Sequence, residues 1–216
     1  MSLCVIVGVG PKIGSNLARA FAAEGLDIAL ISRDAANQTE LAEELRKNGT
    51  TVYSGSMDAT DAEEARRLFS EIKAEGGPPE LVIYNPAVMP MYSFTEITPN
   101  ALEEALPVMV YGAMNTVQAV LPDMRARGRG TLLFTGGGFA VEPSVPRAPH
   151  SIAKAALRNY AHGLFLELKD EGIHAGTVTV HRPIEAGEDM ERCVATFVEF
   201  YREDRAAWSW EKNYGR

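Results

Sequence analysis

The chain has 216 residues and a formal net charge of −8 at pH 7, a length typical of one domain and a charge that argues against non-specific nucleic-acid binding. Its two cysteines, Cys4 and Cys193, are too few for a disulfide framework, and no apolar stretch approaches the ~20 residues that cross a bilayer. We therefore expect a single domain over residues 1–216 that is cytoplasmic and binds neither nucleic acid nor membrane.

The first elements predict a nucleotide-binding unit. The apolar run at 3–9 indicates a buried strand, helical spacing follows over about 12–24, and a second strand is expected at 27–32. Between the first strand and helix lies the glycine-rich turn 8–14, Gly-Val-Gly-Pro-Lys-Ile-Gly. Such a turn lets the backbone and the N–H groups of a helix start approach a pyrophosphate. The alternative is a tight turn that only packs the helix on the strand.

The end of the second strand bears on which dinucleotide would bind. NAD-binding versions of this unit place an acidic side chain near this point, but here Ser32 is followed by Arg33. A guanidinium pairs with a 2′-phosphate in a forked geometry. Asp34 is expected to cap the next helix instead. Arg33 therefore favours NADP(H) over NAD(H), the alternative being a solvent-exposed loop charge.

The alternation of strands and helices continues along the chain. A helix is expected at 36–48, a strand at 51–56, an amphipathic helix after residue 61 and a strand at 80–84. This alternation predicts an α/β fold with a mostly parallel, doubly wound sheet of Rossmann type, with helices on both faces. Ligands bind such sheets beyond the carboxyl ends of the strands. Four segments supply candidate residues at those ends, namely Gly8, Arg33, Asp58 and Asn85.

The second half of the chain continues the same pattern. We expect a long helix at 99–126, a strand at 131–135, a second long helix at 150–171 and a strand at 174–180. A final helix is expected at about 188–203, before a Trp-rich tail at 208–210. The connection between Ile184 and Met190 is short, which predicts an open site without an extended lid.

These residues resemble the short-chain dehydrogenase/reductase family over nearly the whole chain. The residues that carry the resemblance are the glycine turn, Asp58, the Asn85-Pro86-Ala87-Val88 stretch, Lys154 and Pro183-Ile184. The resemblance implies a sheet of order 3-2-1-4-5-6, with a possible seventh strand. It also implies a homodimer or homotetramer formed through helices 99–126 and 150–171.

The resemblance further implies a set of cofactor-binding residues. They are Gly8, Gly10, Lys12, Ile13, Gly14, Ser32, Arg33, Asp58, Ala59, Asn85, Ala87, Lys154, Pro183 and Ile184. Lys12 departs from the family, because it occupies the position of the middle glycine, where it either adds charge near the phosphates or obstructs them. No metal site is expected, since no His, Cys, Asp or Glu set has ligand spacing.

The chain departs from the family at the reacting centre. The family implies a catalytic serine, tyrosine and lysine, with an asparagine supporting a proton relay. Here Gly137 stands at the serine, Met109 at the asparagine and His150 at the tyrosine, while Lys154 is retained. His150 and Lys154 are four residues apart, so they share one helix face, and histidine is a common general acid or base. The alternative for His150 is a pocket-lining side chain without a chemical role.

Two functions follow from this pattern. The first is an NADP(H)-dependent oxidoreductase acting on a small carbonyl or alcohol, with Lys154 and His150 as catalytic residues. The second is a dinucleotide-binding protein without dehydrogenase activity, such as a cofactor sensor or scaffold subunit. Two tyrosines, Tyr111 and Tyr160, are poor substitutes for the missing one, because we expect Tyr111 to face elsewhere and Tyr160 to pack in the core or an interface.

Overall fold

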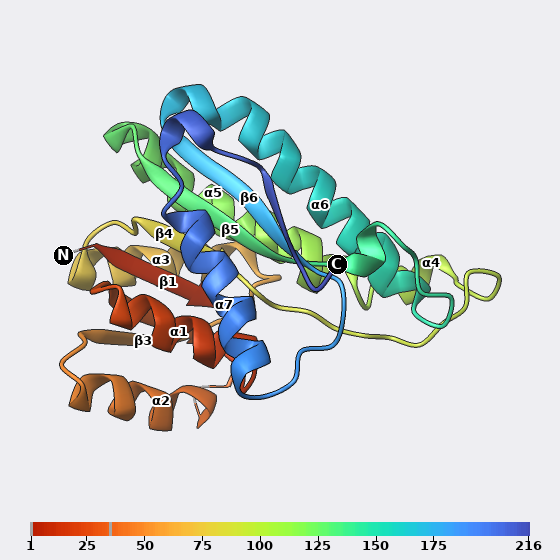
Figure 1. Cartoon of the computed structure of the whole chain (residues 1–216), viewed down its shortest axis with the longest axis horizontal. Helices are drawn as coiled ribbons and strands as arrows, with labels where there is room; N and C mark the ends of the chain where they lie inside the picture. Colours follow the sequence, from red (N-terminus) through yellow and green to blue (C-terminus); the bar gives the residue numbers. More distant parts are fainter. Residues whose placement is uncertain (1, 35) are drawn as a thin grey trace.

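A computed structural model of the chain describes residues 2–34 and 36–216. Its centre is one seven-stranded sheet in the order β3-β2-β1-β4-β5-β6-β7, in which all neighbouring strands are parallel (Figure 1). The strands are β1 (Leu3–Val7), β2 (Asp27–Ser32), β3 (Val52–Ser56), β4 (Leu81–Tyr84), β5 (Gly130–Gly137), β6 (Ile173–Val180) and β7 (Glu211–Tyr214). The predicted strand order is confirmed, including the seventh strand.

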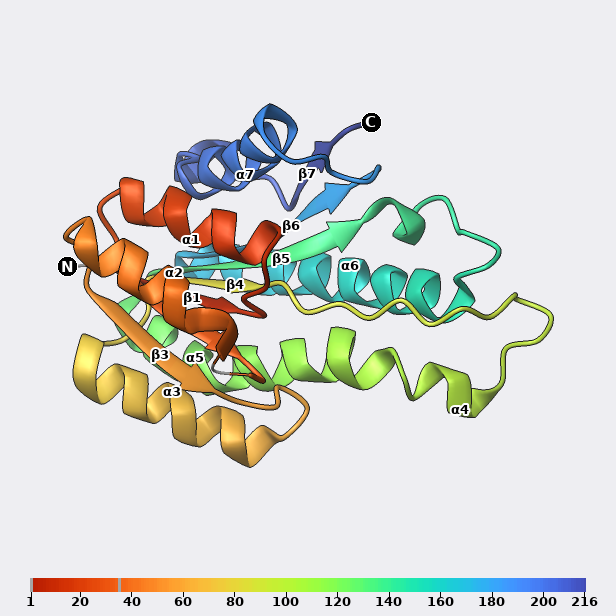
Figure 2. The same cartoon turned by 90° about the horizontal axis from the view of Figure 1, so that it is seen from below.

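Helices cover both faces of the sheet, as predicted (Figure 2). They are α1 (Ile13–Ala23), α2 (Ala36–Lys47), α3 (Ala62–Gly76), α4 (Pro99–Leu102), α5 (Gly112–Arg127), α6 (Ala148–Leu168) and α7 (Glu188–Tyr201). The core clusters place α1, α2 and α7 on one face, and α3, α5 and α6 on the other. None of the helices in the described ranges is long and apolar enough to cross a membrane.

The continuous apolar composition of the strands follows from this double covering. In β1, Leu3 and Val5 join the core under α3, α5 and α6, while Cys4 and Ile6 join the core under α1, α2 and α7. Successive side chains of a strand point to opposite faces, so a strand buried on both faces needs apolar residues at every position. The buried, parallel strands therefore place the polar residues that follow their carboxyl ends along one edge of the sheet.

The predicted long helix at 99–126 is wrong. The structure has the short helix α4, a turn, a π-helical turn at Pro107–Tyr111 and then α5. Proline has no backbone N–H and its ring clashes with the carbonyl four residues earlier, so Pro107 disfavours an unbroken α-helix through Glu103. A backbone carbonyl of the π-helical turn, that of Val108, also accepts a hydrogen bond from the Tyr84 hydroxyl.

The Trp-rich tail packs against α6 and β6. Trp208 stacks on His174 and Trp210 stacks on His162, with ring centroids 4.6 and 4.2 Å apart. The tail is followed directly by β7, which pairs with β6 at the edge of the sheet.

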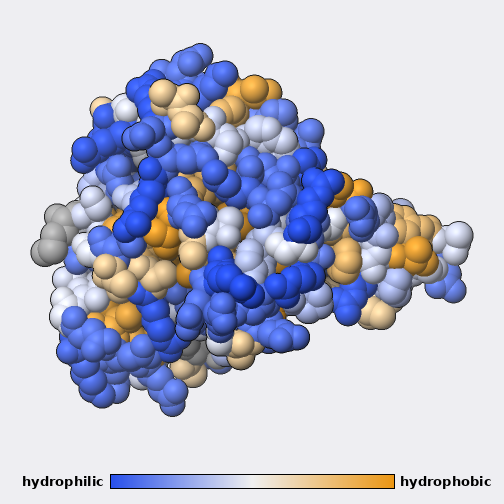
Figure 3. Space-filling view, viewed as in Figure 1, coloured by the Kyte–Doolittle hydropathy of each residue, from blue (hydrophilic) through white to orange (hydrophobic). Residues whose placement is uncertain are grey.

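The segment that leads to α4 extends beyond the sheet (Figure 1). Apolar side chains lie on the surface of this projecting end (Figure 3), and they include Met91 and Phe94, which are 62% and 41% exposed.

Candidate active site

One cavity of about 930 Å³ lies at the carboxyl ends of the strands. All strands run parallel, so the segments that follow β1 to β6 emerge at the same edge of the sheet. The structure brings all the sequence-predicted cofactor and catalytic residues to the wall of this cavity: Gly8, Gly10, Lys12, Ile13, Gly14, Ser32, Arg33, Asp58, Ala59, Asn85, Ala87, His150, Lys154, Pro183 and Ile184. Of the other two residues that replace catalytic residues of the family, Gly137 and Met109, Gly137 lines the cavity as well.

The glycine turn is held in a conformation that requires glycine at two positions. Gly8 has a φ of 87°, in the left-handed region that favours glycine. A Cβ on Gly14 would lie 2.8 Å from the Gly8 carbonyl oxygen and 2.9 Å from the Val9 Cα. The Asn85 side-chain amide donates to the same Gly8 carbonyl at 2.9 Å, which ties the turn to the end of β4.

The start of α1 faces this cavity without a cap. Lys12 precedes the helix, but no side chain accepts a hydrogen bond from the first N–H groups, and the first turn has no acidic residue. The partial positive charge of a helix N-terminus is therefore left uncompensated, which suits an anion. The Lys12 side chain is exposed and forms no ion pair or hydrogen bond with the described residues.

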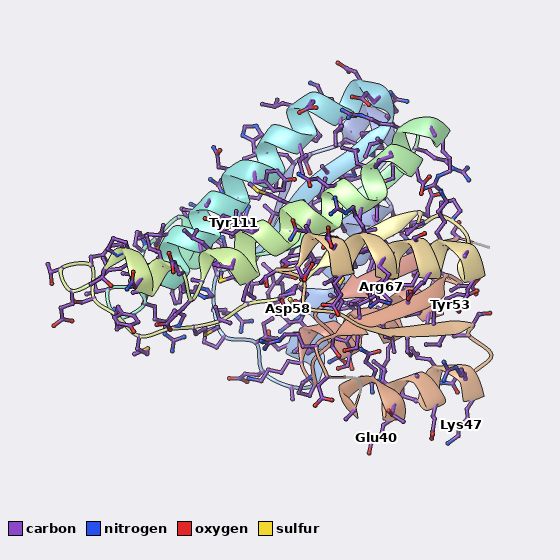
Figure 4. All side chains as sticks on the ribbon, turned by 180° about the vertical axis from the view of Figure 1, so that it is seen from behind. Glu40, Lys47, Tyr53, Asp58, Arg67 and Tyr111 are labelled. Atoms are coloured by element: carbon purple, nitrogen blue, oxygen red, sulfur yellow. The ribbon has the colours of Figure 1, made fainter. Side chains whose placement is uncertain are left out.

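The cavity wall after β2 and β3 carries the predicted nucleotide-end residues. The exposed Arg33 guanidinium has neither an ion pair nor a hydrogen bond to any described residue. The Ser32 hydroxyl, by contrast, is engaged within the protein, donating to the Asp34 carbonyl at 2.6 Å and accepting from Gln38 at 2.7 Å. Asp58, in the loop after β3 (Figure 4), accepts from the Thr60 hydroxyl and N–H.

Lys154 is 3% exposed, and its ammonium group donates to the Thr135 carbonyl at 2.6 Å. Burial lowers its pKa to about 8, because a charged ammonium is disfavoured away from water. The Thr135 hydroxyl in turn donates to the Asn85 side-chain oxygen Oδ1 at 2.9 Å. A continuous set of hydrogen bonds therefore links Lys154 through Thr135 and Asn85 to the glycine turn.

His150 is 3% exposed and its Nδ1 lies 2.7 Å from the Val88 carbonyl oxygen. A carbonyl only accepts hydrogen bonds, so Nδ1 carries the proton. Burial lowers the pKa of His150 below its ordinary value, and the charges of Lys154 and Arg147 oppose protonation further. In the neutral ring the cavity-lining imidazole therefore keeps its lone pair on Nε2, which makes it a proton acceptor.

The residues at the other family positions supply no hydroxyl or amide. A Cβ on Gly137 would lie 3.4 Å from the Lys154 Cγ, so this backbone packs directly on the lysine stem. Met109 is fully buried in a small cluster with Ala105 and Ala153, and it is not part of the cavity wall.

Neither alternative tyrosine reaches the site. Tyr111 is 50% exposed on the π-helical turn (Figure 4), and it does not line the cavity. Tyr160 packs against the core, its ring edge-on to Phe134 at 6.1 Å, and burial raises its pKa to about 12.

The cavity also contains residues that the sequence analysis did not select. Phe139 lies edge-on to the His150 ring, with centroids 5.9 Å apart, and Arg147 donates to the Met89 sulfur at 2.8 Å. His181 also lines the wall, and its Nε2 lies 2.6 Å from the Asn213 side-chain oxygen. Arg147 stands three residues before His150, which is the one sequence signal that could have identified it. No set of three metal-ligating side chains occurs in residues 2–34 and 36–216.

Comparisons with known proteins agree with this architecture. A model of the short chain dehydrogenase family matches residues 2–182. An uncharacterized oxidoreductase of Staphylococcus saprophyticus is 26% identical over 178 residues, which are 82% of this chain and 76% of the relative. The human dehydrogenase/reductase SDR family member 4 is 28% identical over 163 residues, 74% of this chain and 58% of the relative. The chain thus spans little more than half of that second relative.

Solved structures share the whole fold. A short-chain dehydrogenase from Rhodopseudomonas palustris superposes with a TM-score of 0.89 at 21% identity, covering 100% of this chain and 98% of that one. An alcohol dehydrogenase from Thermococcus sibiricus gives a TM-score of 0.87 at 19% identity, covering 99% and 95%. With the family model matching most of its length, the chain belongs to the short-chain dehydrogenase family.

Proposed function

We propose that the protein is an NADP(H)-dependent oxidoreductase that acts on a small carbonyl or alcohol. The observation that carries this proposal is one cavity lined by the glycine turn, an unpaired Arg33, Lys154 and His150 together. Two structural relatives support the choice of cofactor by analogy, the Thermococcus sibiricus enzyme complexed with 5-hydroxy-NADP and a metagenomic short-chain oxidoreductase in complex with NADP.

The cavity fits a dinucleotide in both space and charge. The uncapped start of α1 offers N–H groups to a pyrophosphate, and the glycine turn that leads to it lines the same cavity. Arg33 would pair with the 2′-phosphate, Asp58 would lie near the adenine, and Pro183 and Ile184 would lie near the nicotinamide amide. When bound, the cofactor supplies or accepts the hydride.

Lys154 would hold the nicotinamide ribose. An ammonium group has three donors, and the Thr135 carbonyl takes one of them. With its pKa lowered to about 8, the group stays mostly charged at pH 7 while losing its proton more readily than an exposed lysine. Its two other N–H groups are then available to ribose hydroxyls.

His150 would handle the substrate proton. Its neutral form presents Nε2 as an acceptor, so it can take the proton of a substrate alcohol as hydride leaves the adjacent carbon. Carbonyl reduction needs the reverse, an imidazolium that donates from Nε2. Because burial and two nearby cations lower the pKa of His150, the neutral form prevails at pH 7 and is ready to accept the alcohol proton.

The test begins with binding. NADPH and NADH are titrated by fluorescence into wild type, Arg33→Ala and the surface control Arg19→Ala, whose guanidinium pairs with Glu44 outside the cavity. We expect Arg33→Ala to weaken NADPH selectively and Arg19→Ala to change neither affinity. Absence of binding below about millimolar would refute the cofactor proposal, and equal losses for both dinucleotides would refute the role of Arg33.

Activity is tested next with His150→Phe, which removes the proton acceptor and keeps an aromatic ring. We expect alcohol oxidation to fall about 10²–10⁴-fold with NADP⁺ binding retained. Equal rates for wild type and variant would remove His150 from catalysis.

A second candidate is a dinucleotide-binding protein without dehydrogenase activity. It is favoured by the absence of a hydroxyl at Gly137 and by Met109 lying in the core, away from the cavity. NADPH binding without turnover on a panel of alcohols and carbonyl compounds would support it. By family resemblance we also propose a homodimer or homotetramer through α5 and α6, which light scattering of the purified protein would test.

A further inference from the structure

The strongest unexplained feature of the cavity is Arg147. Arginine side chains of this protein are mostly satisfied by carboxylates, as in the pairs Arg125 with Glu171 and Arg158 with Glu211. Arg147 has no acidic oxygen within 4.0 Å among the described residues. Its side chain makes one hydrogen bond, to the Met89 thioether, and a thioether is a weak acceptor. Most of its five donors are left without a partner.

The position of Arg147 is fixed by the backbone. It directly precedes α6, its N–H bonds to the Ser144 carbonyl, and its own carbonyl accepts from the Ser151 N–H and hydroxyl. An isolated bridge pairs Arg147 with Tyr92 on the projecting segment. Arg147 therefore presents an unpaired guanidinium to the cavity from a backbone position that hydrogen bonds hold in place, and a guanidinium is suited to binding an anion.

The two unpaired guanidiniums lie at different ends of the cavity. Arg33 follows β2, whereas Arg147 precedes α6, which packs against β6, and β1, β4 and β5 separate β2 from β6 in the sheet. Arg33 therefore belongs to the end assigned to the cofactor phosphate, and Arg147 belongs to the end that contains His150. A 2′-phosphate held by Arg33 would leave Arg147 unpaired.

We propose that Arg147 binds a carboxylate of the substrate, so that the substrate is a small oxo acid or the corresponding hydroxy acid. This inference rests on the proposed oxidoreductase function and names its substrate class. A single guanidinium matches one carboxylate in charge and in its two parallel hydrogen bonds. Arg147 directly precedes α6, three residues before His150, and both side chains line the cavity, so a carboxylate on Arg147 would lie beside the group that handles the substrate proton.

The surroundings agree with a small, partly apolar acid. Phe139 and the Met89 thioether form apolar wall beside His150 and Arg147. The connection between β6 and α7 spans only residues 181–187, because α7 already begins at Glu188, so the cavity has no long covering segment there. The charge of Arg147 would therefore select the substrate to a greater extent than a segment closing over the cavity.

The test compares acids with their neutral methyl esters. Pyruvate, acetoacetate and levulinate place the carboxylate one, two and three bonds from the ketone carbon, and each is reduced with NADPH beside its ester. We expect wild type to prefer one acid, and Arg147→Gln to lower the acid-to-ester ratio of kcat/KM by about 10–100-fold, mainly through KM. Arg147→Lys should recover part of the ratio, and the surface control Arg19→Gln should keep it.

Three results would overturn the proposal. They are no preference for any of the three acids in wild type, an unchanged ratio in Arg147→Gln, and a preference for dihydroxyacetone phosphate over dihydroxyacetone without any preference for an acid. The last would make Arg147 a phosphate site instead.

A binding measurement separates this inference from the proposed function. The three acids and their esters are added with NADP⁺, so that no reduction occurs, and the unfolding temperature is recorded. An acid-specific rise that disappears in Arg147→Gln supports the carboxylate site even if turnover is absent, whereas no acid-specific rise for any probe contradicts it. Failure of NADPH to bind refutes the cofactor proposal independently of either result.

Discussion

Replacing Gly14 by alanine should disrupt the glycine turn itself. The added Cβ would lie 2.8 Å from the Gly8 carbonyl oxygen and 2.9 Å from the Val9 Cα, both backbone atoms of that turn. Carbon atoms essentially never approach so closely, and a backbone cannot turn aside as a flexible side chain does. The turn therefore has to shift, and with it the Gly8 carbonyl that Asn85 bonds at 2.9 Å.

The size of the effect follows from these contacts. Overpacking of a well-packed site by one methyl group costs about 1–3 kcal/mol. Loss of the Asn85 bond would add about 1 kcal/mol. We therefore expect Gly14→Ala to lower the free energy of unfolding by about 2–4 kcal/mol. We also expect it to weaken NADPH binding by about 10-fold or more, because the displaced turn no longer presents its N–H groups to the phosphates.

The same turn supplies the control. A Cβ on Gly10 would have no heavy atom within 4 Å, and Gly10 does not have a positive φ. Gly10→Ala should therefore stay within about 0.5 kcal/mol of wild type in urea denaturation. Equal stabilities for the Gly14 and Gly10 variants would refute the argument from close contacts, and an unchanged NADPH affinity in Gly14→Ala would refute the assignment of the turn to the cofactor.

Two further predictions concern the hydrogen bonds behind the site. Burial lowers the pKa of Lys154 from its ordinary 10.5 to about 8, so between pH 8 and 10.5 the unfolded chain binds this proton more strongly than the folded chain does. The free energy of unfolding should therefore rise with pH across that window, by up to about 3 kcal/mol relative to Lys154→Met. A pH-independent difference between the two proteins would contradict the burial of a charged lysine. Asn85→Ala removes the bonds to Gly8 and Thr135 and should lower the free energy of unfolding by about 1–3 kcal/mol, with weaker NADPH binding in the same titration.

The placement of the site was predictable because a parallel sheet leaves little freedom. Strands that alternate with helices all point the same way, so residues such as Gly8, Arg33 and Asn85 had to meet at one edge once the alternation was recognised. The break at Pro107 cannot be predicted from the proline alone, since Pro122 lies inside the continuous helix α5.

The partners of the site residues were not predictable. The bond from His150 to the Val88 carbonyl joins residues 62 positions apart, and no local pattern encodes it. The same holds for Arg147. Its guanidinium has no carboxylate partner among the described residues, and only the folded positions of the acidic side chains reveal this. Sequence patterns therefore locate the groups, while long-range packing determines which of their atoms remain available.

That distinction changes what the substitution of histidine for tyrosine means. Judged by length, the imidazole of His150 is only a shorter side chain than the phenol of the tyrosine that it replaces. The Val88 carbonyl makes it a different kind of group, because it holds the proton on Nδ1 and leaves Nε2 as an acceptor. A tyrosine beside a cation gains acidity, whereas His150 beside Lys154 and Arg147 resists protonation. A bound carboxylate on Arg147 would neutralise one of these cations, so the substrate itself would ease the protonation of His150 that follows alcohol oxidation.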